Sequence, residues 1–173
     1  MSLLNRNVIT LSIAEVYHAA LVGVTRQVTN LRDRRTDAYG AQKEMGWQYH
    51  IEGACGEKAF AKFCGIYWSG AIGDLKSDDV GYFQVRTNSR DNGDLILHYN
   101  DPDDRIFVLL TGLAPTYTVR GWLWGGFGKD DCWWRESAPG LGRPAFFVPQ
   151  KVLHPITELT RESYKRRNSE TRC

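Results

Sequence analysis

The chain has 173 residues, of which 42% are hydrophobic and 24% are charged, and its formal net charge is +2. This length suits one domain with a substantial core, and the near-neutral charge argues against non-specific coating of nucleic acid, although it allows a local basic groove. No apolar run approaches the roughly 20 residues that span a bilayer, and Met1–Arg6 lacks the apolar stretch of a signal peptide. We therefore expect a cytoplasmic protein with no membrane partner.

Two helices are predicted before the main strands. Ser12 and Glu15 form a capping-box pattern, and apolar residues recur behind them at helical spacing, which predicts a helix over about 12–32. A second helix is predicted over 50–64, closed by Gly65 as its C-cap. This helix carries a run of small residues that indicates close packing against another element: Gly53, Ala54, Cys55 and Gly56.

Strand patterns dominate the rest of the chain. Runs rich in β-branched and aromatic residues predict strands at 82–87, 95–99, 106–110, 117–123 and 145–149. Turn-forming sequences between the first four predict an antiparallel meander, whose third strand is apolar on both faces and therefore central. The order of elements predicts an α+β fold, with N-terminal helices packed on a mostly antiparallel sheet.

The chain has four cysteines, and none forms a CxxC pair, so a zinc site is not indicated. Cys55 and Cys64 are nine residues apart on one predicted helix, too far to form a disulfide within it. We expect all four, including Cys132 and Cys173, to be reduced and buried thiols.

The densest polar pattern joins Glu57 on the second predicted helix to the strand that follows Asp78 and Asp79. That strand carries Gln84 and Arg86. Carboxylates, together with carbonyl and water oxygens, hold hard divalent cations, which activate water and neutralise the charge on a phosphate. A nearby cation stabilises the transition state. The alternative is an ordinary polar strand face with a structural Arg86.

This arrangement resembles the PD-(D/E)XK nuclease superfamily, which has the restriction-endonuclease-like fold. Glu57 matches the helix acid of that family and Asp79 its strand aspartate. Gln84 and Arg86 match the glutamate and the lysine of its E-x-K motif. The resemblance implies a Mg²⁺-dependent nuclease that acts on or binds DNA, with the metal held by Glu57, Asp79 and the carbonyl of Val85. It also implies that Arg86 contacts the scissile phosphate, assisted by Gln84.

The chain departs from that family in three ways. Gln84 removes one negative charge from the metal site, the guanidinium of Arg86 cannot readily shed a proton, and Asp79 stands only five residues before Gln84. Strand alternation places Asp78, not Asp79, on the face of Gln84. Two questions therefore stay open: which aspartate is the ligand, and whether the protein kept the fold but lost the chemistry.

The stretch from Gly53 to about Gln150 also resembles phage-type proteins. The shared pattern is D-V-G, V-R-T, D-P-D-D and R-P-A-x-F-V-P-Q, in this order. This resemblance implies a phage or phage-derived locus, and so the cytoplasm of a bacterial host, but it implies no activity.

A second candidate surface mixes aromatic and basic residues between 120 and 135. Aromatic rings beside cations suit base stacking and phosphate contact, so this region is a candidate DNA-binding surface. The same residue types suit core packing or an interface with a host protein or a second copy of the chain, the interpretation that we favour. The candidate residues are Arg120, Lys129, Trp133, Trp134 and Arg135.

The remaining charged segments have simpler interpretations. Residues 100–104 carry three carboxylates that could hold Ca²⁺, but they lack the EF-hand spacing, so a hairpin turn is predicted. The basic run at 161–167 predicts a solvated tail or a phosphate-contacting arm. We expect a single domain over 1–173, with a folded core at about 8–155 and a basic C-terminal tail at 156–173.

Overall fold

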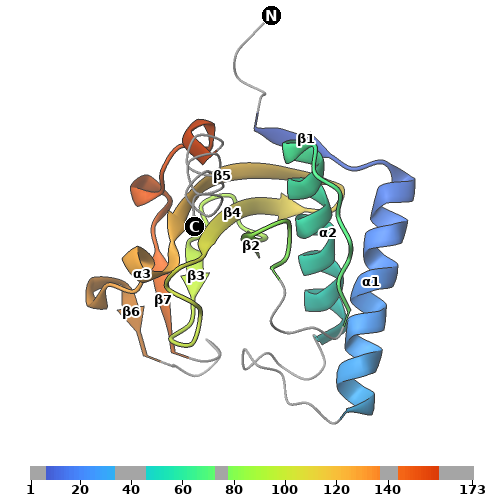
Figure 1. Ribbon diagram of the computed structural model, residues 1–173, viewed down its shortest axis with the longest axis horizontal. Helices are drawn as coiled ribbons and strands as arrows, with labels where there is room; N and C mark the ends of the chain where they lie inside the picture. Colours follow the sequence, from blue (N-terminus) through green and yellow to red (C-terminus); the bar gives the residue numbers. More distant parts are fainter. Residues whose placement is uncertain (1–6, 34–45, 73–77, 137–143, 160–173) are drawn as a thin grey trace, which may run out of the picture.

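In the computed structural model, two helices stand side by side next to a curved sheet (Figure 1). Helix α1 (Ile13–Arg32) and helix α2 (Gly46–Cys64) follow a short first strand, β1 (Val8–Thr10). The fold is α+β, as predicted, and most of its strand pairs are antiparallel. Among the described residues, neither helix combines the length and apolar character that a bilayer crossing requires. The structure describes residues 7–33, 46–72, 78–136 and 144–159.

The helix boundaries follow the local signals. The Ser12 hydroxyl accepts a hydrogen bond from the Glu15 N–H at 3.2 Å, and the Glu15 carboxylate accepts one from the Ser12 N–H at 2.7 Å. This confirms the capping box and the start of α1. Helix α2 begins at Gly46, four residues earlier than predicted. It ends as predicted, before Gly65, whose φ of 66° is the left-handed conformation that glycine adopts easily.

The larger sheet has four strands in the order β1-β5-β4-β2. Strand β5 (Thr116–Trp124) pairs antiparallel with β1 and with β4 (Ile106–Leu113), whereas β2 (Phe83–Asn88) runs parallel to β4. Strand β4 is buried from its first residue through Thr111, which confirms its predicted central position. A second, antiparallel sheet contains β3 (Leu95–Leu97), β7 (Ala145–Val148) and β6 (Trp134–Arg135).

The predicted meander is wrong in its first two connections, whereas its third is confirmed, since β4 and β5 form an antiparallel hairpin. Strands β2 and β3 do not pair, so residues 91–94 are not a hairpin turn between neighbours, and neither are residues 100–104. The chain leaves β2, adds β3 to the second sheet and returns to place β4 parallel to β2. A parallel neighbour requires such a crossover because the chain must return to the same end of the sheet. A turn sequence cannot show this, since it looks the same whichever sheet the next strand joins.

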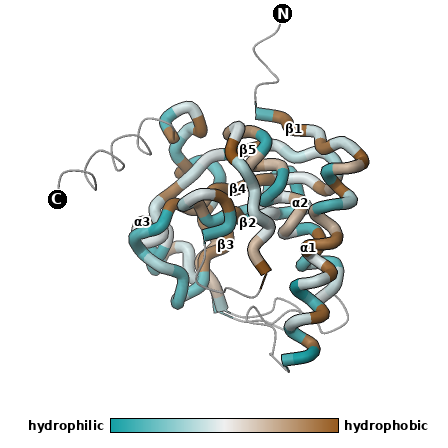
Figure 2. Tube along the Cα trace, turned by 45° about the vertical axis from the view of Figure 1, so that its right-hand side comes forward, coloured by the Kyte–Doolittle hydropathy of each residue, from teal (hydrophilic) through white to brown (hydrophobic). Residues whose placement is uncertain are grey.

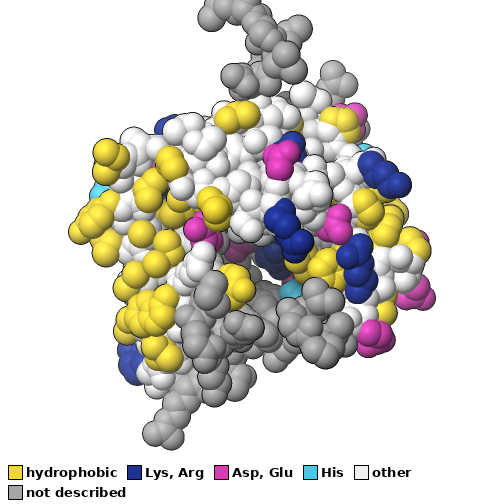
Figure 3. All heavy atoms as spheres, turned by 180° about the vertical axis from the view of Figure 1, so that it is seen from behind, with side chains coloured by type: hydrophobic (Ala, Val, Ile, Leu, Met, Phe, Trp, Pro, Cys, Tyr) yellow, Lys and Arg dark blue, Asp and Glu magenta, His cyan; other side chains and the backbone are white. Residues whose placement is uncertain are grey.

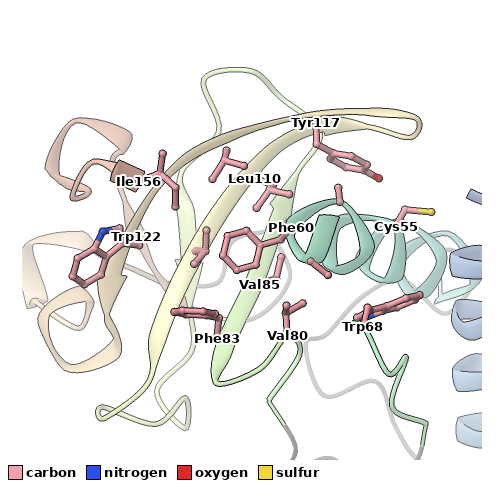
Figure 4. Close-up of a cluster of buried hydrophobic side chains, with 14 of the residues drawn as sticks. Cys55, Phe60, Trp68, Val80, Phe83, Val85, Leu110, Tyr117, Trp122 and Ile156 are labelled. Atoms are coloured by element: carbon pink, nitrogen blue, oxygen red, sulfur yellow. The ribbon is translucent and has the colours of Figure 1, made fainter. Parts of the chain in front are cut away.

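Buried clusters lie on both faces of the large sheet. Along β4, Val108 belongs to the cluster beneath α2, whereas Phe107 and Leu109 belong to the cluster beneath the second sheet. Figure 4 shows Phe60 of α2 pointing into the first cluster, where it meets Phe83 edge-on with ring centroids 5.5 Å apart. Two residues beyond position 155 also join this cluster: Ile156 and Leu159.

The cysteines differ in their surroundings. Cys55 is buried, as predicted, and burial raises the pKa of its thiol to about 11. Cys64 is half-buried, and desolvation raises its pKa to about 12. Cys132 is exposed, contrary to the prediction, because it lies in a surface 3₁₀ turn. These three are free thiols, and Cys173 lies outside the described residues.

Candidate functional site

Helix α2 approaches β2 closely where Gly56 faces Thr87. A Cβ atom at Gly56 would collide with the methyl group of Thr87, so this approach requires glycine. The contact accounts for Gly56 among the small residues of this helix, but not for Gly53, where a Cβ atom would meet open space. It also brings the next residue, Glu57, to the edge of the sheet, where its charge acts on Asp79.

Glu57 is held by three hydrogen bonds from outside its own helix. Arg26 of α1 donates from Nη1 to Oε1 at 2.6 Å and from Nη2 to Oε2 at 2.9 Å, and Trp68 Nε1 donates to Oε2 at 3.1 Å. Arg26 Nε also donates to the carbonyl of Ala71 at 3.0 Å. The Glu57 side chain is only 7% exposed. A two-pronged pair between arginine and a carboxylate is a strong, directional contact, so Glu57 ties α2 to α1 and to the segment after α2.

Asp79 covers the outer edge of β2. Its Oδ2 accepts the Val85 N–H at 2.8 Å, and its own N–H donates to the Phe83 carbonyl at 3.1 Å. Nη1 of Arg86 lies 3.4 Å from the Val85 carbonyl oxygen and 3.8 Å from Asp79 Oδ2. The guanidinium therefore contacts two of the oxygens that the nuclease motif assigns to the metal.

Arg86 has a second carboxylate partner that the sequence analysis did not identify. Its Nη2 donates to Asp101 Oδ1 at 3.0 Å, while Asp101 Oδ2 accepts the His98 N–H at 2.8 Å. The guanidinium also lies over the Phe107 ring, 5.0 Å from its centroid. Within the described residues, no group of three or more acidic, histidine or cysteine side chains is arranged to hold a metal ion, at residues 100–104 or elsewhere.

Asp78 pairs with Gln84, but not by the strand alternation that the prediction invoked: the chain turns back between Val80 and Phe83, so Asp78 precedes β2 and lies opposite Gln84. The Gln84 amide donates to Asp78 Oδ1 at 3.0 Å, and Arg105 Nε donates to the same oxygen at 3.1 Å. The candidate site thus divides into two parts. Glu57, Asp79 and Arg86 are brought together at the edge of β2, whereas Gln84 is engaged by Asp78.

Asp79 is the acid whose protonation the site changes most clearly. Burial and the nearby charge of Glu57 raise the pKa of Asp79 to about 6, although Arg86, the Val85 N–H and Arg26 act in the opposite direction. Two acids with interacting charges are a common feature of catalytic sites, but structural ion-pair networks produce the same effect.

This raised pKa predicts how stability depends on pH. The folded-state pKa of Asp79 lies above its ordinary value, so the stability it contributes is present below about pH 4 and is lost as the pH rises through about 6. Asp79→Asn keeps an oxygen for the Val85 N–H but cannot titrate. We expect urea denaturation at several pH values to give this variant a flatter stability profile between about pH 4 and 6. The exposed Asp104→Asn serves as control, and equal profiles for Asp79→Asn and the wild type would contradict the prediction.

The basic residues of the second candidate surface are engaged within the chain. Lys129 Nζ donates to Asp103 at 2.7 Å and to the carbonyls of Tyr99 and Asp101. Lys129 therefore stabilises the turn before β4 through these hydrogen bonds. The three acceptors of Lys129 come from one turn about 30 residues earlier in the chain, and no spacing in the sequence indicated this contact.

The two arginines of that surface behave similarly. Arg120 donates to the Thr111 hydroxyl at 2.6 Å and pairs with Asp91. Arg135 lies over the Phe147 ring, 4.8 Å from its centroid, and pairs with Asp94 at 3.4 Å. Trp133 and Trp134 pack on the cluster beneath the second sheet. There the Trp134 ring meets the Phe146 ring with centroids 4.8 Å apart.

Sequence reasoning missed the arginine that neutralises Glu57. Arg26 lies on the same side of α1 as the buried residues Ala19 and Gly23, and small residues at helical spacing mark a face that packs closely. That face could have indicated a buried partner for a carboxylate. No protein-family model, no curated protein and no solved structure matches this chain.

Proposed function

We propose that the chain is a non-catalytic protein with a restriction-endonuclease-like core, in which arginines take the place of the metal, and that it acts by binding another protein. The observation that carries the proposal is the position of the Arg86 guanidinium. It lies 3.4 Å from the Val85 carbonyl oxygen and 3.8 Å from Asp79 Oδ2, both of which the motif would offer to Mg²⁺.

The oxygens of the site, as arranged, do not fit a divalent cation. Mg²⁺ needs several oxygens converging at about 2.0–2.1 Å. Both Glu57 oxygens instead accept hydrogen bonds from Arg26, and the Asp79 and Val85 oxygens lie beside Arg86. A cation placed among them would meet two guanidinium charges, so binding would require both arginines to move.

Protein binding is favoured over DNA binding because the basic groups of the candidate DNA surface already have acidic partners. Arg120, Lys129 and Arg135 each pair with an aspartate of the same chain. A DNA-binding groove gains affinity by neutralising phosphates with cations and releasing counterions, and paired cations contribute less to this.

A Mg²⁺-dependent nuclease is the second candidate, favoured by the interaction between Glu57 and Asp79. Burial and, after it, the charge of Glu57 raise the pKa of Asp79, and a divalent cation would relieve the repulsion between the two acids. In this case Glu57 and Asp79 hold the metal, Arg86 contacts the phosphate and Gln84 assists. The metal would supply an activated water and neutralise charge on the phosphate.

A cleavage and binding experiment separates the two candidates. Single-stranded, double-stranded and branched DNA are incubated with the protein and Mg²⁺ or Mn²⁺, and metal binding is measured by calorimetry. We expect neither metal-dependent cleavage nor a binding heat from the wild type. Cleavage that disappears in both Glu57→Ala and Asp79→Ala, but persists in the surface control Glu158→Ala, would overturn the proposal and support the nuclease.

A further inference from the structure

The outward face of α1 is apolar, while its inward face carries polar groups. The buried residues of this helix include Gln27, and Arg26 also points inward, to Glu57. Ile13, at the start of the outward face, is 92% exposed. A surface helix of a monomer normally shows the reverse pattern. The outward residues, here called the α1 stripe, are Ile13, Tyr17, Leu21, Val24, Val28 and Leu31, all exposed except the half-buried Val24.

The figures show this face on the outside of the molecule. Helix α2 separates α1 from the sheet, so the far side of α1 is not covered by the described elements (Figure 1). Apolar residues recur along α1 in the hydropathy view (Figure 2). Hydrophobic side chains gather over the side of the molecule that carries α1 when it is seen from behind (Figure 3).

The spacing of the stripe matches the seam of a coiled coil. From Tyr17 to Leu31, successive members are separated by four, three, four and three residues. A second α1 placed antiparallel about a two-fold axis between Leu21 and Val24 would bring Leu21 opposite Val24 and Tyr17 opposite Val28. Every contact then occurs twice, as a two-fold symmetric interface requires.

We propose that two copies of this chain form a dimer through the α1 stripe, with the two helices antiparallel. Five of the stripe's side chains are large and exposed, and together they present on the order of 600 Å², close to the roughly 800 Å² that each partner buries in a stable interface. Antiparallel helices also align their macrodipoles favourably. The inference goes beyond the proposed function, because it rests on α1 alone and not on the site at β2.

The charges along α1 permit this pairing. Its acidic and basic side chains are neutralised within the chain, in the pairs Glu15–Lys62, Arg26–Glu57 and Arg32–Asp33. These three pairs leave no net charge on the described part of α1 that would repel a second copy. A membrane surface is a poorer match, because helices that lie on membranes are rich in lysine and arginine on their polar face, whereas the two arginines of α1 are paired with acids of the same chain.

The two longest segments outside the described residues carry no sequence pattern that matches the stripe. Residues 34–45 and 160–173 are rich in charged and polar residues, and neither contains a run of large apolar residues at helical spacing. A second α1 supplies that pattern in the required length.

Light scattering after size exclusion, together with sedimentation over a concentration series, tests the proposal. We expect a mass twice the 19.7 kDa of one chain. Leu21→Glu with Val28→Glu should give a monomer with unchanged circular dichroism, because both positions are exposed. Tyr99→Glu with Phe127→Glu, which changes exposed apolar residues elsewhere, should remain a dimer. A monomeric wild type, or a dimer that persists in the first variant, overturns the proposal whatever the cleavage assay gives.

Cysteine cross-linking tests the orientation of the two helices. In a Cys132→Ser, Cys173→Ser background, Tyr17→Cys combined with Val28→Cys should form an intermolecular disulfide on mild oxidation. Neither single cysteine should cross-link, because each lies far from its own copy in an antiparallel pair. Cross-linking by Tyr17→Cys alone would overturn the antiparallel arrangement.

Discussion

Glu57→Ala is expected to lower the free energy of unfolding by about 3–5 kcal/mol, since breaking a buried ion pair leaves the other charge without compensation. Arg26 would lose both of its short hydrogen bonds to the carboxylate, and Trp68 would lose its acceptor. Urea or guanidinium denaturation measures the change directly.

Two further variants make this prediction specific. Glu158→Ala removes an acid that is about half exposed, and its effect should stay below about 0.5 kcal/mol. Arg26→Met combined with Glu57→Leu should recover much of the loss, because an apolar pair of similar volume leaves no unpaired charge. A Glu57→Ala protein more stable than the wild type would contradict the prediction, and would instead suit an acid kept for a metal at the expense of stability.

Phe60→Ala is expected to destabilise the protein by about 3–5 kcal/mol, because the change leaves a cavity between α2 and the large sheet. Phe60 is fully buried and meets the Phe83 ring edge-on. The matched control is Phe127→Ala, where the ring is 70% exposed and the loss should be small. Equal thermal-denaturation midpoints for Phe60→Ala and Phe127→Ala would show that the cluster beneath α2 does not stabilise the fold.

The sequence predicted elements whose signals are local. The capping box at Ser12 and the left-handed Gly65 located helix ends, since each depends on backbone groups a few residues away. The expected neighbourhood of Asp78 and Gln84 is present, but a turn at Gly81 produces it, not the alternation of one continuous strand. The early start of α2 at Gly46 was missed.

Features that depend on distant contacts could not be predicted in the same way. The parallel pairing of β2 and β4 depends on where β3 docks, and β3 joins a strand about 50 residues later in the chain. The site showed the same limit. A motif can select Glu57 and Arg86, but their partners Arg26 and Asp101 come from separate elements. The sequence therefore identified Glu57 and Arg86 but neither of the partners that neutralise them.

The edge of the large sheet has a consequence for how the molecule behaves in a crowded solution. β2 is an outer strand, and an outer strand with open backbone groups invites a strand from another molecule to pair with it. Here the Val85 N–H is taken by Asp79, the Val85 carbonyl by Arg86 and the Phe83 carbonyl by the backbone of Asp79 and Val80. Asp79 and Arg86, which the motif would assign to phosphate chemistry, thus help to cover the first half of this strand against pairing with another molecule.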